Sequence, residues 1–77
     1  MKLNNIRPAK AAKFLEKRGW EFVNREGTHA TYLFTDERGN TKSVQVIYNS
    51  KTIYWKNMKE MVKRTGIPEE EWKKNCK

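Results

Sequence analysis

The stretch WEFVNREGTHATYLF, residues 20–34, decides the fold of this chain. Its first run, Trp20 to Arg25, is aromatic and roughly alternating, and its second run, Thr28 to Phe34, is again rich in β-branched and aromatic residues. Both patterns are typical of β-strands. Gly27 breaks the sequence between the two runs, as turn residues do. The stretch therefore predicts a β-hairpin.

A third strand follows the hairpin. Residues 36–40, DERGN, are polar and contain a glycine, so they predict a turn. Thr41 to Ile47 then places Val44 and Val46 in alternation with polar neighbours, which is the pattern of a strand with one buried face. We therefore predict a three-stranded antiparallel meander.

Amphipathic helices lie on both sides of the strands. Pro8 suits the first position of a helix and Gly19 suits its end. Between them, apolar side chains recur at helical spacing opposite a lysine stripe: Pro8, Ala11, Ala12, Phe14 and Leu15 against Lys10, Lys13 and Lys17. A second helix is predicted from Ile53 to Thr65, ended by Gly66, with an apolar face of Tyr54, Met58, Met61, Val62 and Thr65 and a basic face of Lys56, Lys59 and Lys63.

The predicted order is α-β-β-β-α, an α+β fold in one domain over residues 1–77. Each helix has one apolar stripe, so the economical packing puts both helices on one face of the three-stranded antiparallel sheet and leaves the other face partly open to solvent. The acidic residues 69–71 start a last helical piece, from which Trp72 returns to the core.

The amino-acid composition limits the classes of molecule that this chain is expected to bind. Seventeen Lys and Arg against nine Asp and Glu give a formal net charge of +8, so the chain attracts polyanions. Nucleic acid, an anionic membrane and an acidic protein are the candidates. A single cysteine, Cys76, excludes an internal disulfide and favours a reducing compartment. Neither end carries a long apolar segment, so we expect a cytoplasmic protein that does not enter a membrane. One histidine and one terminal cysteine predict no metal site.

The motifs, taken in order, resemble those of the HicA family, small ribonuclease toxins of bacterial and archaeal toxin–antitoxin pairs with a double-stranded-RNA-binding-like fold. The resemblance covers roughly residues 6–72. It is carried by the helix residues 11–18 (AAKFLEKR), the Gly19-Trp20 step, the Gly27-Thr28-His29 tripeptide, Tyr32, Val44, Val46, and the last helix from Met58 to Gly66 with Ile67.

The chain departs from the family pattern at two places. Many members carry Pro-x-His after the third strand, where this chain has Val46-Ile47-Tyr48-Asn49. Many also carry Gly-Thr at the entry of the last helix, where this chain has Lys56-Asn57. What the resemblance implies is His29 as the catalytic residue, mRNA as the substrate and a HicB-like antitoxin protein as the partner, with no cofactor.

The chemistry expected of His29, the only histidine, follows from RNA itself. When a base removes the proton of a 2′-hydroxyl, that oxygen can attack the adjacent phosphorus without any metal. Histidine takes and gives protons near neutral pH and can serve as this base. The products would be a 2′,3′-cyclic phosphate and a 5′-hydroxyl. The second proton transfer would come from His29 again, from water, or from Tyr32 or Tyr48.

Substrate contacts are expected beside His29. Gly27 lets a phosphate approach the backbone, and Thr28 belongs to the same tripeptide. The developing charge needs cations, for which Arg25 and Lys42 on neighbouring strands and Lys51 ahead of the last helix are the candidates.

The sequence is also compatible with two other functions. A noncatalytic RNA-binding module of the same fold fits the missing second histidine, and a small basic protein that only binds an acidic partner fits the charge. The lysine stripes are expected to be solvated helix faces that steer RNA by charge. Trp20 and Trp72 are expected in or at the edge of the core; Trp55 is a core-edge residue or one that stacks on a base or docks a partner.

Overall fold

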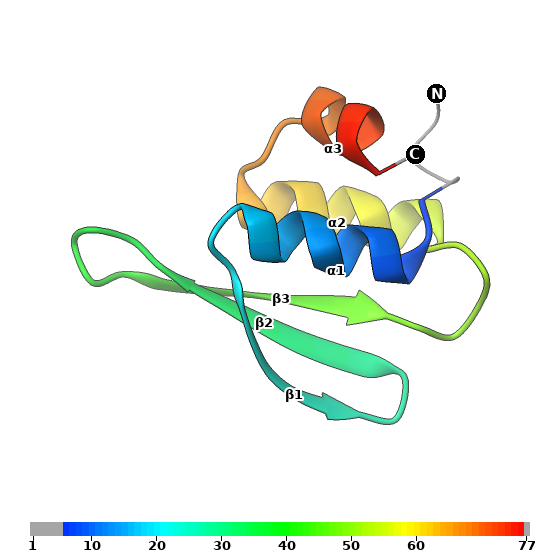
Figure 1. Cartoon of the computed structure of the whole chain (residues 1–77), viewed down its shortest axis with the longest axis horizontal. Helices are drawn as coiled ribbons and strands as arrows, with labels where there is room; N and C mark the ends of the chain where they lie inside the picture. The colour runs from blue at the N-terminus through cyan, green and yellow to red at the C-terminus, as the bar shows by residue number, and fades with distance from the viewer. Residues whose placement is uncertain (1–5, 77) are drawn as a thin grey trace.

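The computed structural model describes residues 6–76 of the chain. Figure 1 shows three helices and a three-stranded antiparallel sheet in the strand order β1-β2-β3. The elements are α1 (Pro8–Lys17), β1 (Glu21–Glu26), β2 (His29–Thr35), β3 (Thr41–Ile47), α2 (Trp55–Thr65) and α3 (Glu69–Asn75). The α+β class and the predicted order are confirmed, and α3 is the last helical piece, which begins with the acidic residues 69–71.

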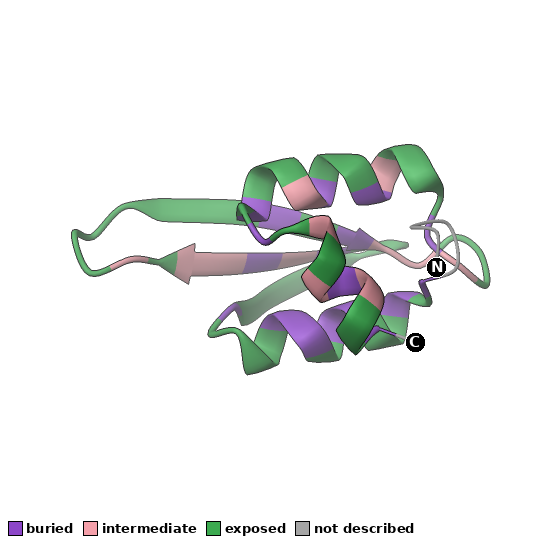
Figure 2. Ribbon diagram, turned by 90° about the horizontal axis from the view of Figure 1, so that it is seen from above, coloured by how far each residue is buried: buried purple, intermediate pink, exposed green. Residues whose placement is uncertain are grey.

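The sheet is covered by helices on one face only. In Figure 1, α1 and α2 lie on the same side of the strands, and α3 lies over the two helices. The alternation along the strands agrees, because Ala30 and Tyr32 of β2 and Val44 and Val46 of β3 are buried while their neighbours are not. All six residues of β1 are exposed, as Figure 2 shows, so this edge strand extends beyond the helical layer.

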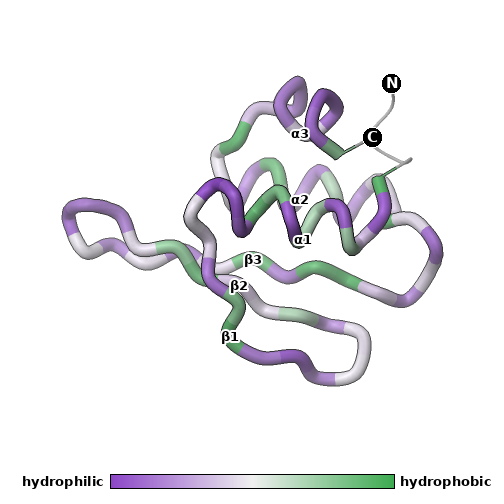
Figure 3. The backbone as a smooth tube through the Cα atoms, in the orientation of Figure 1, coloured by the Kyte–Doolittle hydropathy of each residue, from purple (hydrophilic) through white to green (hydrophobic). Residues whose placement is uncertain are grey.

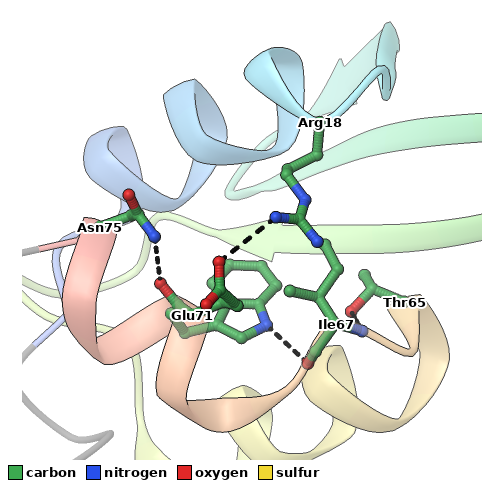
Figure 4. Close-up of polar contacts among 6 residues, drawn as sticks. Arg18, Thr65, Ile67, Glu71 and Asn75 are labelled. Carbon is green, nitrogen blue, oxygen red and sulfur yellow. Dashed lines mark hydrogen bonds and ion pairs between the residues drawn. The ribbon is translucent and has the colours of Figure 1, made fainter.

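Trp72 anchors α3 to the rest of the molecule. Its side chain is fully buried, and its ring meets Phe14 edge-on with 4.7 Å between the ring centroids. The indole Nε1–H donates to the carbonyl oxygen of Ile67 at 3.2 Å, a bond drawn in Figure 4. Figure 4 also shows the exposed ion pair that joins Arg18, just past α1, to Glu71 of α3 at 3.4 Å. The apolar contact, rather than this solvated pair, holds the third helix in place.

The second helix begins at Trp55, two residues later than predicted. The backbone N–H of Ile53 donates to the carbonyl oxygen of Ile6 at 2.7 Å, and Tyr54 is extended, with φ −57° and ψ 136°. Ile53 and Tyr54 therefore lie outside the helix, which begins after the extended Tyr54. As a result Tyr54 is exposed, and its predicted place on the apolar face is wrong. The predicted end is confirmed, because Gly66 has the left-handed φ of 72° that closes a helix.

In Figure 3, α1 and α2 carry both hydrophilic and hydrophobic residues along their length, whereas α3 is mostly hydrophilic. Among residues 6–76, none of the helices combines the length and the apolar character that crossing a bilayer requires.

Cys76 is buried at the end of α3, and burial raises the pKa of its thiol to about 11, from 9.0. The unfolded chain therefore ionises this thiol first, so its contribution to stability is complete below pH 9 and is lost as the pH rises toward 11. We expect the free energy of unfolding to fall by about 2 kcal/mol between pH 7 and pH 10.5 from this group.

Urea titrations at the two pH values measure this loss. Cys76→Ser is the control, because it removes the thiol and keeps the size of the side chain. It should retain only the smaller loss that the buried Tyr32 hydroxyl causes. An equal loss in the wild type and in this variant would contradict the assignment to Cys76.

Candidate functional site

The sheet face away from the helices carries His29. Side chains alternate along β2, so while Ala30 and Tyr32 face the helices, His29 and Thr31 face the opposite side. His29 is exposed and stands at the first position of the strand. The residues directly across from it are Glu26 on β1 and Ile47 on β3. His29 therefore lies on an open, rigid surface with neighbours on both sides.

A two-residue turn sets the position of His29. Gly27 and Thr28 connect β1 to β2. Gly27 has a φ of +57°, whereas the φ of Thr28 is not positive. A glycine with positive φ followed by a residue with negative φ is the pattern of the type II′ turn, which matches the twist of a hairpin. Gly27 is thus required by the turn itself, and the space where its Cβ would stand is also open.

The backbone and the ring of His29 are both held through Thr28. The Thr28 hydroxyl lies 3.3 Å from Nδ1 of His29. The carbonyl oxygen of Thr28 accepts a 2.7 Å hydrogen bond from the N–H of Tyr48, which ties the turn to the end of β3. When Nδ1–H donates to the Thr28 hydroxyl, Nε2 is the nitrogen that faces outward for proton exchange. The structure therefore brings Gly27, Thr28 and His29 together, as a tripeptide requires.

Glu26 is a residue of this site that our sequence analysis missed. It flanks the turn on the β1 side and is the cross-strand partner of His29. Directly opposed residues share a face and have Cβ atoms about 4.5–5.5 Å apart. Both side chains line one shallow pocket on the open face, together with Val23, Asn24, Thr31 and Gln45. The signal was present in the sequence, because the two residues that flank a two-residue hairpin turn always oppose each other.

Arg25 reaches the turn but serves the other face of the sheet. Its register partner is the buried Ala30, so its side chain leaves β1 on the helical side. There its guanidinium lies over the ring of Tyr48, with Cζ 4.3 Å from the ring centroid, and Nε–H donates to the carbonyl oxygen of Gly27 at 2.9 Å. Arg25 thus braces the turn, while His29 projects from the opposite face.

Lys42 lies far from His29. Ile47 is the β3 residue opposite His29, and Lys42 comes five residues earlier, roughly 17 Å along a strand. Its ammonium lies instead near Gly66, 4.0 Å from the place where a Cβ on that residue would stand. The expectation that Lys42 lies near the histidine is wrong, because antiparallel pairing carries it to the other end of the hairpin. Lys51 is exposed in the loop that leaves the His29 end of β3.

Neither tyrosine shares the face of His29. Tyr32 is buried beneath the helices, and burial is the main cause that raises its pKa to about 12, helped by the neighbouring Tyr48. Tyr48 continues the alternation of Val44 and Val46, which places it on the same helical side. The two tyrosine hydroxyls named as alternatives for the second proton transfer therefore lie on the other face of the sheet from His29, whereas Glu26 is the ionisable group directly opposite it.

The pocket at His29 borders a second depression at the β3 edge of the sheet, next to α2. Thr31 and Gln45 line the pocket, and the same two residues line the second depression, which reaches the helix at Asn57, Glu60 and Arg64. There Arg64 donates to Glu60 at 2.9 Å. The two depressions therefore share Thr31 and Gln45, and the second one joins the open face to α2 at the edge of the sheet.

Within the described residues 6–76, His, Cys, Asp and Glu side chains form no group of three or more that could hold a metal ion. No protein-family model and no curated protein sequence matches this chain.

Proposed function

We propose that this chain is a HicA-like toxin of a toxin–antitoxin pair: an endoribonuclease that cleaves mRNA without a metal and uses His29 as general acid/base. The observation that supports it best is the placement of His29. It is exposed on the open face, its only side-chain hydrogen bond within residues 6–76 is to the adjacent Thr28, and Glu26 stands directly opposite. The fold does not need this imidazole, so it is free for chemistry.

The two facing groups supply both proton transfers of RNA cleavage. The Glu26 carboxylate accepts the proton of the 2′-hydroxyl, and the 2′-oxygen forms a bond to the adjacent phosphorus. The bond from phosphorus to the 5′-oxygen breaks, and the imidazolium of His29 gives that oxygen its proton. The products are a 2′,3′-cyclic phosphate and a 5′-hydroxyl. Thr28 suits this role of His29, since its hydroxyl accepts from Nδ1–H while Nε2–H points to the substrate.

The net charge of the chain is compatible with an RNA substrate. A net charge of +8 attracts RNA and raises its local concentration at the surface. Lys51, in the exposed loop at the same end of the sheet, is the cation best placed to approach the scissile phosphate. A HicB-like antitoxin is the partner implied by the resemblance, and by covering the open face it would block Glu26 and His29 together.

A noncatalytic RNA-binding module of the same fold is the second candidate. It is favoured by the positions of the expected cations: Lys42 lies at the far end of the sheet, and the Arg25 guanidinium is held on Tyr48. Fewer cations at the site leave less stabilisation for the charge that develops during cleavage.

Cleavage of a labelled single-stranded RNA in the presence of EDTA separates the two candidates. We expect fragments that end in 2′,3′-cyclic phosphate and carry 5′-hydroxyl groups, with a rate that the chelator leaves unchanged. Phosphatase and kinase treatment of the fragments identifies these ends. RNA that is bound in a salt-dependent manner but stays intact would favour the binding module, and fragments that end in 3′-hydroxyl groups would contradict the mechanism.

A further inference from the structure

Two adjacent aromatic side chains are exposed at the start of α2. Tyr54 and Trp55 are 54% and 40% exposed, whereas Trp20 and Trp72 are 4% and 0% exposed. The rings of Tyr54 and Trp55 lie together, with 5.9 Å between their centroids. Large exposed aromatic surfaces of this kind mark sites that bind another molecule. The hydrophobic core, closed by the other two tryptophans, does not use them.

Lysines surround the exposed rings. The ammonium groups of Lys56 and Lys59 lie 5.6 and 5.4 Å from the centroid of the Trp55 ring. The first N–H groups of α2 add positive potential at the same place, since Tyr54 makes no side-chain cap there. We call Tyr54, Trp55, Lys56 and Lys59 the α2 platform. It combines flat π-surfaces with cations, which is the chemistry that recognises single-stranded nucleic acid.

We propose that the α2 platform binds single-stranded RNA, with a base stacked on Trp55 and the neighbouring phosphates on Lys56 and Lys59. The stretch of RNA must be unpaired, because bases within a duplex have both faces covered by their neighbours. The platform deepens the proposed function by adding a second contact for the same substrate, and it rests on that function.

The platform and His29 lie at the same end of the molecule. In Figure 1 the β1–β2 turn and the first turn of α2 are both at the right-hand end, where β3 leaves the sheet for the loop to α2. The hydrogen bond from Tyr48 to Thr28 joins the start of that loop to the turn that carries His29. The platform is on the helical side of the sheet and His29 is on the open face, so a strand of RNA that passes around this end of the sheet would contact both places, held by stacking on Trp55 while another linkage meets His29.

Binding measured in a His29→Ala background tests the proposal independently of cleavage. The probe is a fluorescently labelled 12-nucleotide RNA without self-complementarity. We expect Trp55→Ala, added to that background, to weaken binding by about 5- to 100-fold, which is the range for one stacked base. Trp55→Phe should restore most of the affinity. Phe22→Ala is the matched control, because it removes another exposed ring from β1, away from the α2 platform, and should leave binding unchanged.

A second probe, an abasic strand of the same length, separates stacking from charge. We expect Trp55→Ala to have little effect on its binding, whereas a loss equal to that seen with RNA would contradict stacking. Unchanged RNA affinity after Trp55→Ala would overturn the proposal, as would a His29→Ala parent that binds no RNA. Weakened binding of an antitoxin with RNA binding intact would assign the platform to a protein instead. If the platform binds RNA but the proposed cleavage at His29 is wrong, the wild-type protein will bind the RNA and leave it uncut.

Discussion

Replacing His29 by alanine is expected to slow RNA cleavage by about 10²- to 10⁴-fold, the usual contribution of a positioned general acid or base. The fold should be unaffected, because the side chain is exposed and, in the described part of the chain, hydrogen-bonds only to the adjacent Thr28. Single-turnover cleavage of a labelled RNA measures the effect. In bacteria, induction of the wild-type protein should arrest growth with loss of mRNA, and induction of the variant at equal abundance should do neither.

Glu26→Gln provides the matched comparison on the opposite strand. Glutamine keeps the size of the side chain and the hairpin but accepts no proton, so we expect slower cleavage and loss of the acidic limb of the bell-shaped pH–rate profile. A merely structural role for Glu26 would lower the rate without changing the shape of that profile. Equal cleavage by the wild type and His29→Ala would remove the catalytic assignment of His29, whereas bound but uncut RNA with both proteins would leave the RNA-binding module as the function.

Replacing Trp72 by alanine is expected to destabilise the protein by about 3–5 kcal/mol, as truncation of a fully buried aromatic side chain does. The indole packs on Phe14 and donates to the carbonyl oxygen of Ile67. The variant therefore loses the apolar contact and the hydrogen bond to this carbonyl oxygen. Domains of this length have about 4–12 kcal/mol of stability in total. We therefore expect a largely unfolded or marginally folded protein, visible in urea titrations followed by circular dichroism.

Trp55→Ala is the control for this prediction, because the same side chain is removed from an exposed position. It should change the free energy of unfolding by about 0.5 kcal/mol or less, as is usual at the surface. Similar stability losses in the two variants would contradict the burial that separates these tryptophans. Loss of stability in Trp72→Ala without loss of α3 contacts to α1 would likewise contradict the anchoring role of Trp72.

The elements of this fold are largely readable from the sequence. The bounds of β3 agree at both ends with the predicted Thr41 to Ile47, and α1 and β2 agree within about two residues, because local periodicity and glycine stops decide them. The start of α2 was wrong, since a hydrogen bond between Ile53 and Ile6 is a contact between distant residues. No local pattern contains that bond.

The candidate site shows the same difference between what local sequence predicts and what depends on tertiary contacts. The sequence by itself determined that the chain is basic, that its one histidine follows a turn glycine, and that the strands have one apolar face. Only the tertiary structure decided which groups meet at His29. Pairing across β1 and β2 brings Glu26 opposite the histidine, sends Arg25 to the helical face, and carries Lys42 to the far end of the sheet. The physical reason is that register and sheet face are set by pairing between strands, and a shift of one residue would exchange every one of these neighbours.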